Sequence, residues 1–154
     1  MKSNYQVLTH TPERINVIST KLGATKGEQY GDGDLNKPMV MGKQGNMYIA
    51  PADAEIEGFL DNIDAGPTAD GFIFGGVKRC GMGTRQKVIV EDAASVLDFV
   101  VAGTNEAVGV ANAQKLGVVK KSAAVPEVHK WRIISFADNT EATVGGGVAV
   151  IEKL

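Results

Sequence analysis

The stretch that decides the fold is Met39-Val40-Met41-Gly42-Lys43-Gln44-Gly45-Asn46-Met47-Tyr48-Ile49-Ala50. Two short apolar runs flank a polar turn that contains glycine and asparagine, and this pattern is typical of a β-hairpin. The composition of the whole chain agrees with this interpretation. Val and Ile occur 28 times against 7 Leu, beside 19 glycines. Because β-branched side chains fit a pleated sheet and glycine serves tight turns and bulges, the sequence predicts a mainly β protein.

Apolar runs elsewhere in the chain predict the remaining strands. They cover residues 55–60, 71–79, 86–91, 99–102, 107–111, 117–120, 131–136 and 147–153. We expect 71–79 to pair with 55–60 and, across the turn at 81–84, with 86–91, with a bulge at a glycine of 71–79. Residues 92–98 are the best helical candidate, with Asp92 as its cap. The predicted fold class is a small barrel or sandwich of short antiparallel strands with at most one short helix.

The first 36 residues have few apolar side chains, and residues 27–34 contain three glycines and three acids. This composition predicts an extended or flexible N-terminal arm over 1–36, with one strand around 15–19, followed by a β-rich domain over 37–154. Residues 39–50 also resemble residues 100–111, which lie 61 positions further on. Either an old duplication or the shared chemistry of two hairpin turns explains this similarity.

Charge and cysteine content exclude several classes of function. The net charge of −2 and the pI near 5.7 disfavour binding to nucleic acid or to an anionic membrane. Cys80 is the only cysteine, which excludes an internal disulfide and a cysteine-based zinc site. We find no signal segment and no apolar stretch long enough to span a membrane. A protein made in a reducing cytoplasm is therefore expected.

Loop motifs that bind phosphate or calcium are incomplete in this chain. The segment Gly81-Met82-Gly83 lacks the third glycine and the following helix of a dinucleotide loop. Residues 32–36 alternate oxygen ligands as a calcium loop does, but lysines stand at 37 and 43, where a glycine and a bidentate acid are needed. A hairpin turn and an acidic turn are the better interpretations.

Catalytic constellations are equally incomplete. His10 and His129 have no nearby nucleophile motif, and Cys80 lies beside Lys78, Arg79 and Arg85, a setting that lowers a thiol pKa only if the charges converge. The carboxylates that could form an acid/base pair through the fold are Asp61, Asp64, Asp70, Glu91 and Asp92. We predict no catalytic, cofactor-binding or metal-binding residue, and we expect the protein not to be an enzyme.

Three basic clusters remain, at 78–79, 85–87 and 120–121. Such clusters on strands keep exposed faces soluble, or they face an acidic protein surface. Trp131, between Lys130 and Arg132, could be a core residue or an interface anchor.

The order of several segments resembles the small capsid decoration, or cement, proteins of tailed bacteriophages. These segments are Lys37-Pro38-Met39-Val40-Met41-Gly42, Ile49-Ala50, Glu55-Ile56-Glu57-Gly58-Phe59-Leu60, Asp98-Phe99-Val100-Val101-Ala102-Gly103, Val108-Gly109-Val110-Ala111, Leu116-Gly117-Val118-Val119-Lys120-Lys121, Trp131-Arg132-Ile133-Ile134-Ser135 and Val144-Gly145-Gly146-Gly147-Val148-Ala149-Val150. The similarity covers residues 37–154 and includes no catalytic signature.

The resemblance implies a structural virion protein that binds the outer surface of the capsid and bridges major capsid subunits. It implies a homotrimer whose repeated contacts gain avidity. The similarity does not extend to residues 1–36, and from their composition we expect this arm to be mobile in the free protein and to order on the capsid. Two alternatives remain open. One is a phage tail or baseplate component, and the other is a small β-barrel hydrolase or ligand-binding domain that uses Cys80 or the loop from Asp61 to Asp70.

Overall fold

The computed structural model describes residues 17–68, 70–79, 81–104, 116–123, 130–137 and 147–154. The strands are β1 (Val17–Leu22), β2 (Pro38–Met41), β3 (Met47–Ile49), β4 (Gly58–Pro67), β5 (Ile73–Arg79), β6 (Arg85–Val90), β7 (Val100–Ala102), β8 (Gly117–Lys121), β9 (Trp131–Phe136) and β10 (Gly147–Lys153). The described residues contain no α-helix, and one 3-10 turn, η1, covers Asp32–Asp34. The prediction of a mainly β fold with a small barrel is therefore confirmed.

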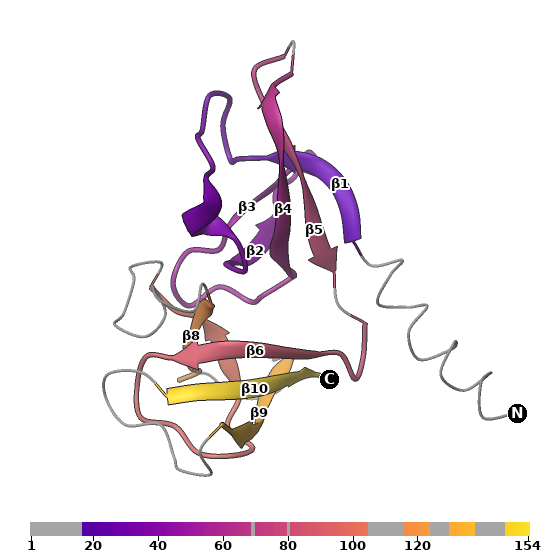
Figure 1. The fold of residues 1–154 in the computed structure, drawn as a ribbon. Coiled ribbons are helices and arrows are strands. Elements are labelled where there is room, and N and C mark those ends of the chain that lie inside the picture. The colour runs from indigo at the N-terminus through magenta and orange to yellow at the C-terminus, as the bar shows by residue number, and fades with distance from the viewer. Residues whose placement is uncertain (1–16, 69, 80, 105–115, 124–129, 138–146) are drawn as a thin grey trace, which may run out of the picture.

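The first five strands close into a barrel in the order β1-β3-β2-β4-β5, which we call the first barrel (Figure 1). The predicted hairpin is present, because β2 and β3 pair antiparallel with Val40 opposite Tyr48. Closure depends on β1, which runs antiparallel to β5 along all its residues and meets β3 in parallel only at Leu22 and Met47. The core of this barrel consists of Leu22, Met39, Met47, Leu60, Ile73 and Val77.

The glycine pair Gly75 and Gly76 in β5 allows the close approach of β4. An added Cβ on Gly75 would overlap the main-chain oxygen of Asn62, and one on Gly76 would overlap the Asn62 side chain. The Asn62 side chain also accepts a hydrogen bond of 3.0 Å from the N–H of Gly76. The register shifts here between Leu60 and Asn62, so the irregularity expected near a glycine of this strand lies on its partner β4.

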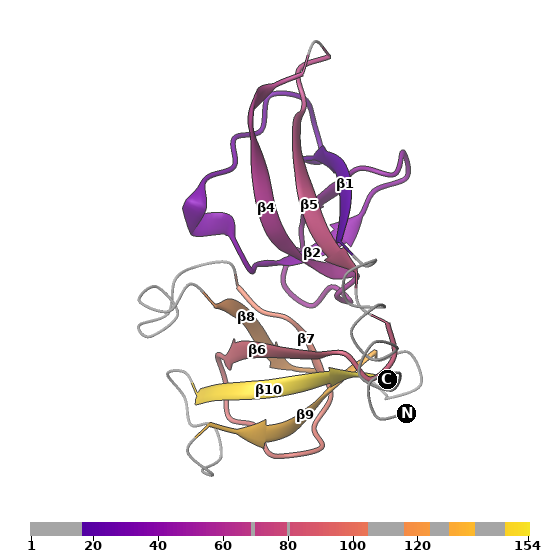
Figure 2. The same cartoon turned by 45° about the vertical axis from the view of Figure 1, so that its right-hand side comes forward.

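The last five strands form a second sheet in the order β7-β8-β6-β10-β9 (Figure 2). It curls toward closure, since Phe99 next to β7 bridges to Arg132 in β9. The pairing of β6 and β8 is parallel, unlike the antiparallel pairing expected throughout. The predicted partnership of 86–91 with 71–79 is wrong, because β6 pairs with β10 and β8, whereas β5 stays in the first barrel.

A shared core joins the first barrel to the second sheet. Ala50, Ile56 and Phe59 from the first half of the chain are buried in the same cluster as side chains of β6 to β10. The segment before β4 also hydrogen-bonds to β7, because the N–H of Asp53 donates to the oxygen of Ala102 at 2.9 Å. The two halves therefore pack as one structure.

Residues 92–98 are not helical, which corrects the helix prediction. Leu97 has φ +73°, and its N–H donates to the oxygen of Ile133 in β9 at 2.8 Å. The Asp98 carboxylate accepts the N–H of Ser95 at 2.9 Å. Because these groups bond across to a strand and within a turn, the i to i−4 ladder of a helix does not form.

In the described part of the predicted arm over 1–36, β1 overlaps the strand expected around 15–19, but residues 17–36 do not form a separate extended arm. Residues 17–36 include β1, and Tyr30 and Leu35 pack against the core of the first barrel. The boundary expected at residue 36 therefore does not separate an arm from the barrel. Residues 1–16 and the predicted strand at 107–111, which carries the end of the internal repeat, lie outside the described residues.

Candidate interaction surface

Trp131, the first residue of β9, lies at the junction of the first barrel and the second sheet. Its side chain is fully buried, and its ring meets Phe59 edge-on with centroids 5.5 Å apart. The indole N–H donates to the main-chain oxygen of Ile56 at 3.2 Å. Of the two roles that the sequence left open for this side chain, the structure shows the core role.

Charged side chains lie near Trp131 at the surface of this junction. Lys130 Nζ contacts Glu57 Oε1 at 2.5 Å, and both side chains are about one-third exposed. The hydrogen bond from Lys130 lowers the pKa of the Glu57 carboxyl, with further lowering from the charges of Lys153 and Arg79. Lys153 Nζ also lies 5.5 Å from the centre of the Trp131 ring. Glu57 therefore pairs with Lys130, while Arg79 lies on the neighbouring strand opposite Gly58.

A second group of charges lies at the start of β6, the start of β9 and the end of β10. Glu152 in β10 is flanked by Arg85 in β6 and Arg132 in β9. Its oxygens lie 3.3 Å from Arg85 Nε and 3.6 Å from Arg132 Nη2. The longer distance exceeds ordinary hydrogen-bond range, and the buried Nε of Arg132 has no hydrogen-bond partner in the described structure. The Glu152 carboxylate is thus shared by two guanidinium groups and does not satisfy all their hydrogen-bond donors.

The turn between β5 and β6 places an apolar side chain beside these charges. The N–H of Gly83 donates to the oxygen of Lys153 at 2.7 Å, and the N–H of Lys153 donates to Thr84 at 2.9 Å. Met82 is 87% exposed on this anchored turn. Leu154 is 41% exposed, and its N–H donates to the oxygen of Lys130 at 2.7 Å.

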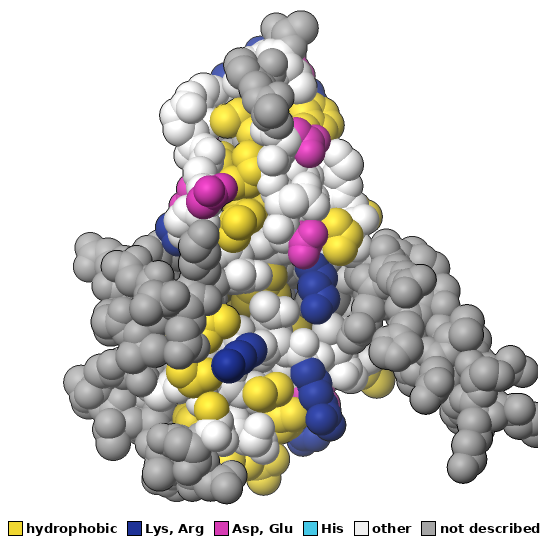
Figure 3. Space-filling view, viewed as in Figure 1, with side chains coloured by type: hydrophobic (Ala, Val, Ile, Leu, Met, Phe, Trp, Pro, Cys, Tyr) yellow, Lys and Arg dark blue, Asp and Glu magenta, His cyan; other side chains and the backbone are white. Residues whose placement is uncertain are grey.

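We call this whole surface the basic corner. It consists of Arg79, Met82, Arg85, Lys130, Arg132, Lys153 and Leu154, together with the carboxylates Glu57 and Glu152. Figure 3 shows dark blue side chains near the end of β5 and near the start of β6 and the end of β10, with yellow side chains beside them. The surface is formed by four parts of the chain that are distant from one another in sequence: residue 57, 79–85, 130–132 and 152–154.

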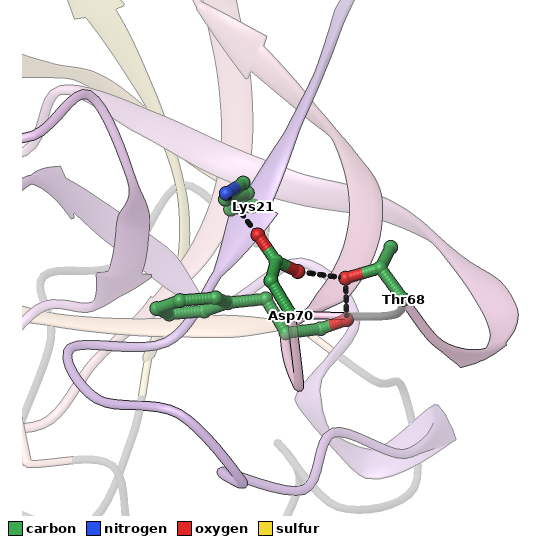
Figure 4. A network of polar contacts seen from close by, with 4 residues as sticks. Lys21, Thr68 and Asp70 are labelled. Atoms are coloured by element: carbon green, nitrogen blue, oxygen red, sulfur yellow. Dashed lines mark hydrogen bonds and ion pairs between the residues drawn. The ribbon is translucent and has the colours of Figure 1, made fainter.

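The tip of the β4–β5 hairpin carries a separate polar network (Figure 4). Asp70 accepts hydrogen bonds from Lys21 Nζ and from the Thr68 hydroxyl, and these two contacts lower the pKa of the Asp70 carboxyl to about 2. Lys21 Nζ lies 5.2 Å from the centre of the Phe72 ring. The network therefore ties the hairpin tip to β1.

The other sequence candidates have structural roles or lie outside the described residues. Asp61 and Asp64 are exposed along β4. Glu91 accepts from the N–H of Thr104 at 3.0 Å, and Asp92 accepts from the N–H of Lys121 at 3.0 Å. Asp70, Glu91 and Asp92 therefore accept hydrogen bonds from turns and strand ends, and Asp61 and Asp64 are exposed along β4.

The remaining basic cluster, Lys120–Lys121, is occupied by ion pairs. Lys120 Nζ lies 2.6 Å from Asp53, and Lys121 Nζ lies 3.1 Å from Asp98. Cys80, His10 and His129 lie outside the described residues. In the described ranges, no three His, Cys, Asp or Glu side chains gather in a way that could bind a metal. Those ranges also hold no helix long and apolar enough to cross a membrane.

The sequence shows the separate basic clusters of the basic corner, but it does not show that they lie side by side in the folded protein. The clusters at 78–79 and 85–87 and the cations beside Trp131 were visible as separate features. Their convergence depends on β10 lying between β6 and β9. The chain matches no protein-family model, no curated protein and no solved structure.

Proposed function

We propose that this protein is a structural component of a bacteriophage head that binds the outer surface of the capsid and bridges major capsid subunits. The observation that supports the proposal best is the shared core at Trp131, Phe59 and Ile56. A bridging protein must hold separate contact surfaces at a fixed spacing, because a flexible joint would lose the avidity of simultaneous contacts. The shared core provides that rigidity.

The exposed features lie at one end of this rigid body and at its middle. The β4–β5 hairpin extends from the end of the first barrel that points away from the second sheet, and the network of Lys21, Thr68 and Asp70 braces its tip (Figures 1 and 4). The basic corner lies at the junction. Together these surfaces could contact two neighbouring subunits, and association as a homotrimer would repeat each contact three times around the symmetry axis.

The test is binding to shells assembled from the major capsid protein of the source genome. We expect the protein to co-sediment with the shells and to raise their melting temperature in calorimetry, because ligands of the assembled state stabilise it. Electron microscopy of the complexes should then show added density on the outer surface. Shells that neither bind the protein nor gain stability would overturn the proposal, as would density confined to tail structures.

A further inference from the structure

We propose that the basic corner is the docking surface for an acidic segment of a partner protein, which under the proposed function is a segment of the capsid shell subunit. The inference rests on the proposed function, and it assigns the partner chemistry of one surface. It goes beyond the general bridging role because it names the side chains that would carry one of the contacts.

The first argument is the local excess of positive charge. The basic corner contains five cations and two carboxylates, which leaves three net positive charges on its surface. The whole chain has a formal charge of −2, so the rest of the sequence carries −5. A positive surface on an acidic protein attracts a negative partner selectively and repels like-charged neighbours.

The second argument is that internal carboxylates leave much of this charge unmatched. Arg79 is exposed and forms no ion pair with a carboxylate of the described residues. The Arg85 side chain is 66% exposed, although its Nε contacts Glu152. Arg132 shares that same Glu152 at a longer distance. Planar guanidinium groups of this kind bind carboxylates in bidentate fashion, so an incoming Asp or Glu would find available donors.

The third argument concerns the class of partner. Met82 and Leu154 place exposed apolar surface among the cations. A flexible methionine adapts to an apolar side chain of a protein partner, whereas a phosphate backbone offers nothing comparable to contact. These features favour an acidic polypeptide that carries at least one apolar residue over a nucleic acid.

The geometry of the surface also favours docking. The turn that carries Met82 is fixed to β10 by the hydrogen bonds of Gly83 and Thr84 with Lys153. The ammonium group of Lys153 in β10 is held over the ring of the buried Trp131. A surface that is ordered before binding loses little conformational entropy on association.

The test compares two double variants in shell binding. Arg79→Glu with Arg85→Glu reverses two charges in the basic corner, and the matched control Lys26→Glu with Lys43→Glu reverses two exposed charges outside it. We expect the corner variant to lose at least about tenfold in affinity for the shells, because its two new glutamates would face the acidic segment of the partner. The binding should also lose much of its salt dependence, because the attraction between opposite charges is gone. The control should bind within about twofold of the wild type. Met82→Ser should weaken binding roughly fivefold without changing the salt dependence.

A second measurement works without shells and separates the two proposals. Titration of the isotope-labelled protein with poly-glutamate, followed by NMR, should shift the signals of residues 79, 82–85, 130–132 and 152–154. A duplex DNA fragment of equal charge should bind more weakly. If wild-type protein fails to bind shells while poly-glutamate maps to the corner, the proposed function fails and the surface chemistry stands.

Three results would overturn the inference itself. These are equal shell binding by the corner variant and the control, poly-glutamate shifts that lie elsewhere, and tighter binding to DNA than to poly-glutamate. Thermal unfolding of each variant checks that the fold is retained, because Arg79, Arg85, Lys26 and Lys43 are all exposed.

Discussion

Trp131 donates a hydrogen bond of 3.2 Å to the main-chain oxygen of Ile56, although 75 residues separate them in the sequence. The bond joins the start of β9 to the segment that leads into β4. It satisfies the one polar atom of a side chain that is otherwise buried among apolar groups. This bond and the packing of Trp131 against Phe59 are therefore part of the shared core that joins the two halves of the chain.

Replacing Trp131 should destabilise the whole protein. Trp131→Ala should lower the free energy of unfolding by about 3–5 kcal/mol, because it leaves a cavity beside Phe59 and an unpaired carbonyl at Ile56. Trp131→Phe should cost less, since it keeps an aromatic ring in the site. Urea unfolding followed by circular dichroism measures both changes. A cost below about 1 kcal/mol for the alanine variant would contradict the shared core.

The glycine pair in β5 should tolerate no side chain. Gly75→Ala should lower the free energy of unfolding by about 1–3 kcal/mol or more, because the new methyl group meets main-chain atoms of β4 that cannot turn aside. Gly76→Ala should cost less if the Asn62 side chain rotates away. Gly33→Ala is the control, since a methyl group there meets nothing within 4 Å. Equal melting temperatures for the Gly75 variant and the control would refute the close approach of β4 and β5.

The carboxyl of Asp70 should titrate at unusually low pH. Its pKa is lowered from 3.8 to about 2 in the folded protein, first by the hydrogen bond from Lys21. A depressed folded pKa means that the contribution to stability is present above the unfolded pKa and is lost as pH falls toward about 2. Lys21→Met should therefore move the pKa up toward 3.8 in a carbon-detected NMR titration. Lys26→Met, the matched control, should leave it unchanged.

The leucine at position 97 should not stabilise its own backbone conformation, because that conformation favours glycine. It holds φ +73° with a side chain that is 62% exposed. Leu97→Gly should hold or raise the free energy of unfolding by up to about 1 kcal/mol, because glycine adopts the left-handed region without strain. The neighbouring Val96→Gly has no such relief and should cost about 0.5–1 kcal/mol. Chemical unfolding of both variants checks the sign, and a clear loss at position 97 would contradict the assignment.

Local pattern predicted most strands and two of their pairings, β2 with β3 and β4 with β5, but not the partners of 86–91. The hairpin at 39–50 and the strands at 131–136 and 147–153 were correct, because apolar runs between turn residues report on local conformation. The partner of 86–91 was wrong, since a short turn at 81–84 suggested a hairpin. In the folded protein that turn is the crossing between the first barrel and the second sheet.

Two other differences arose from contacts that are distant in sequence. The short apolar run at 92–98 looked helical, yet Leu97 bonds to Ile133. Residues 17–36 looked too polar to pack, because β1 presents only Leu22 fully to the core. The basic corner could not be assembled for the same reason, since adjacency of β6, β9 and β10 is a tertiary property.

The division of the apolar clusters also has a consequence for the order of events during translation. The cluster of Leu22, Met39, Met47, Leu60, Ile73 and Val77 lies wholly within the first half of the chain, so this half can acquire a core as it leaves the ribosome. Ile56 and Phe59 are buried only after β9 has been synthesised and packs against them. A nascent chain halted after Arg79 would expose the apolar side chains of Ile56 and Phe59 to solvent. Such a chain would bind chaperones or self-associate until synthesis resumed.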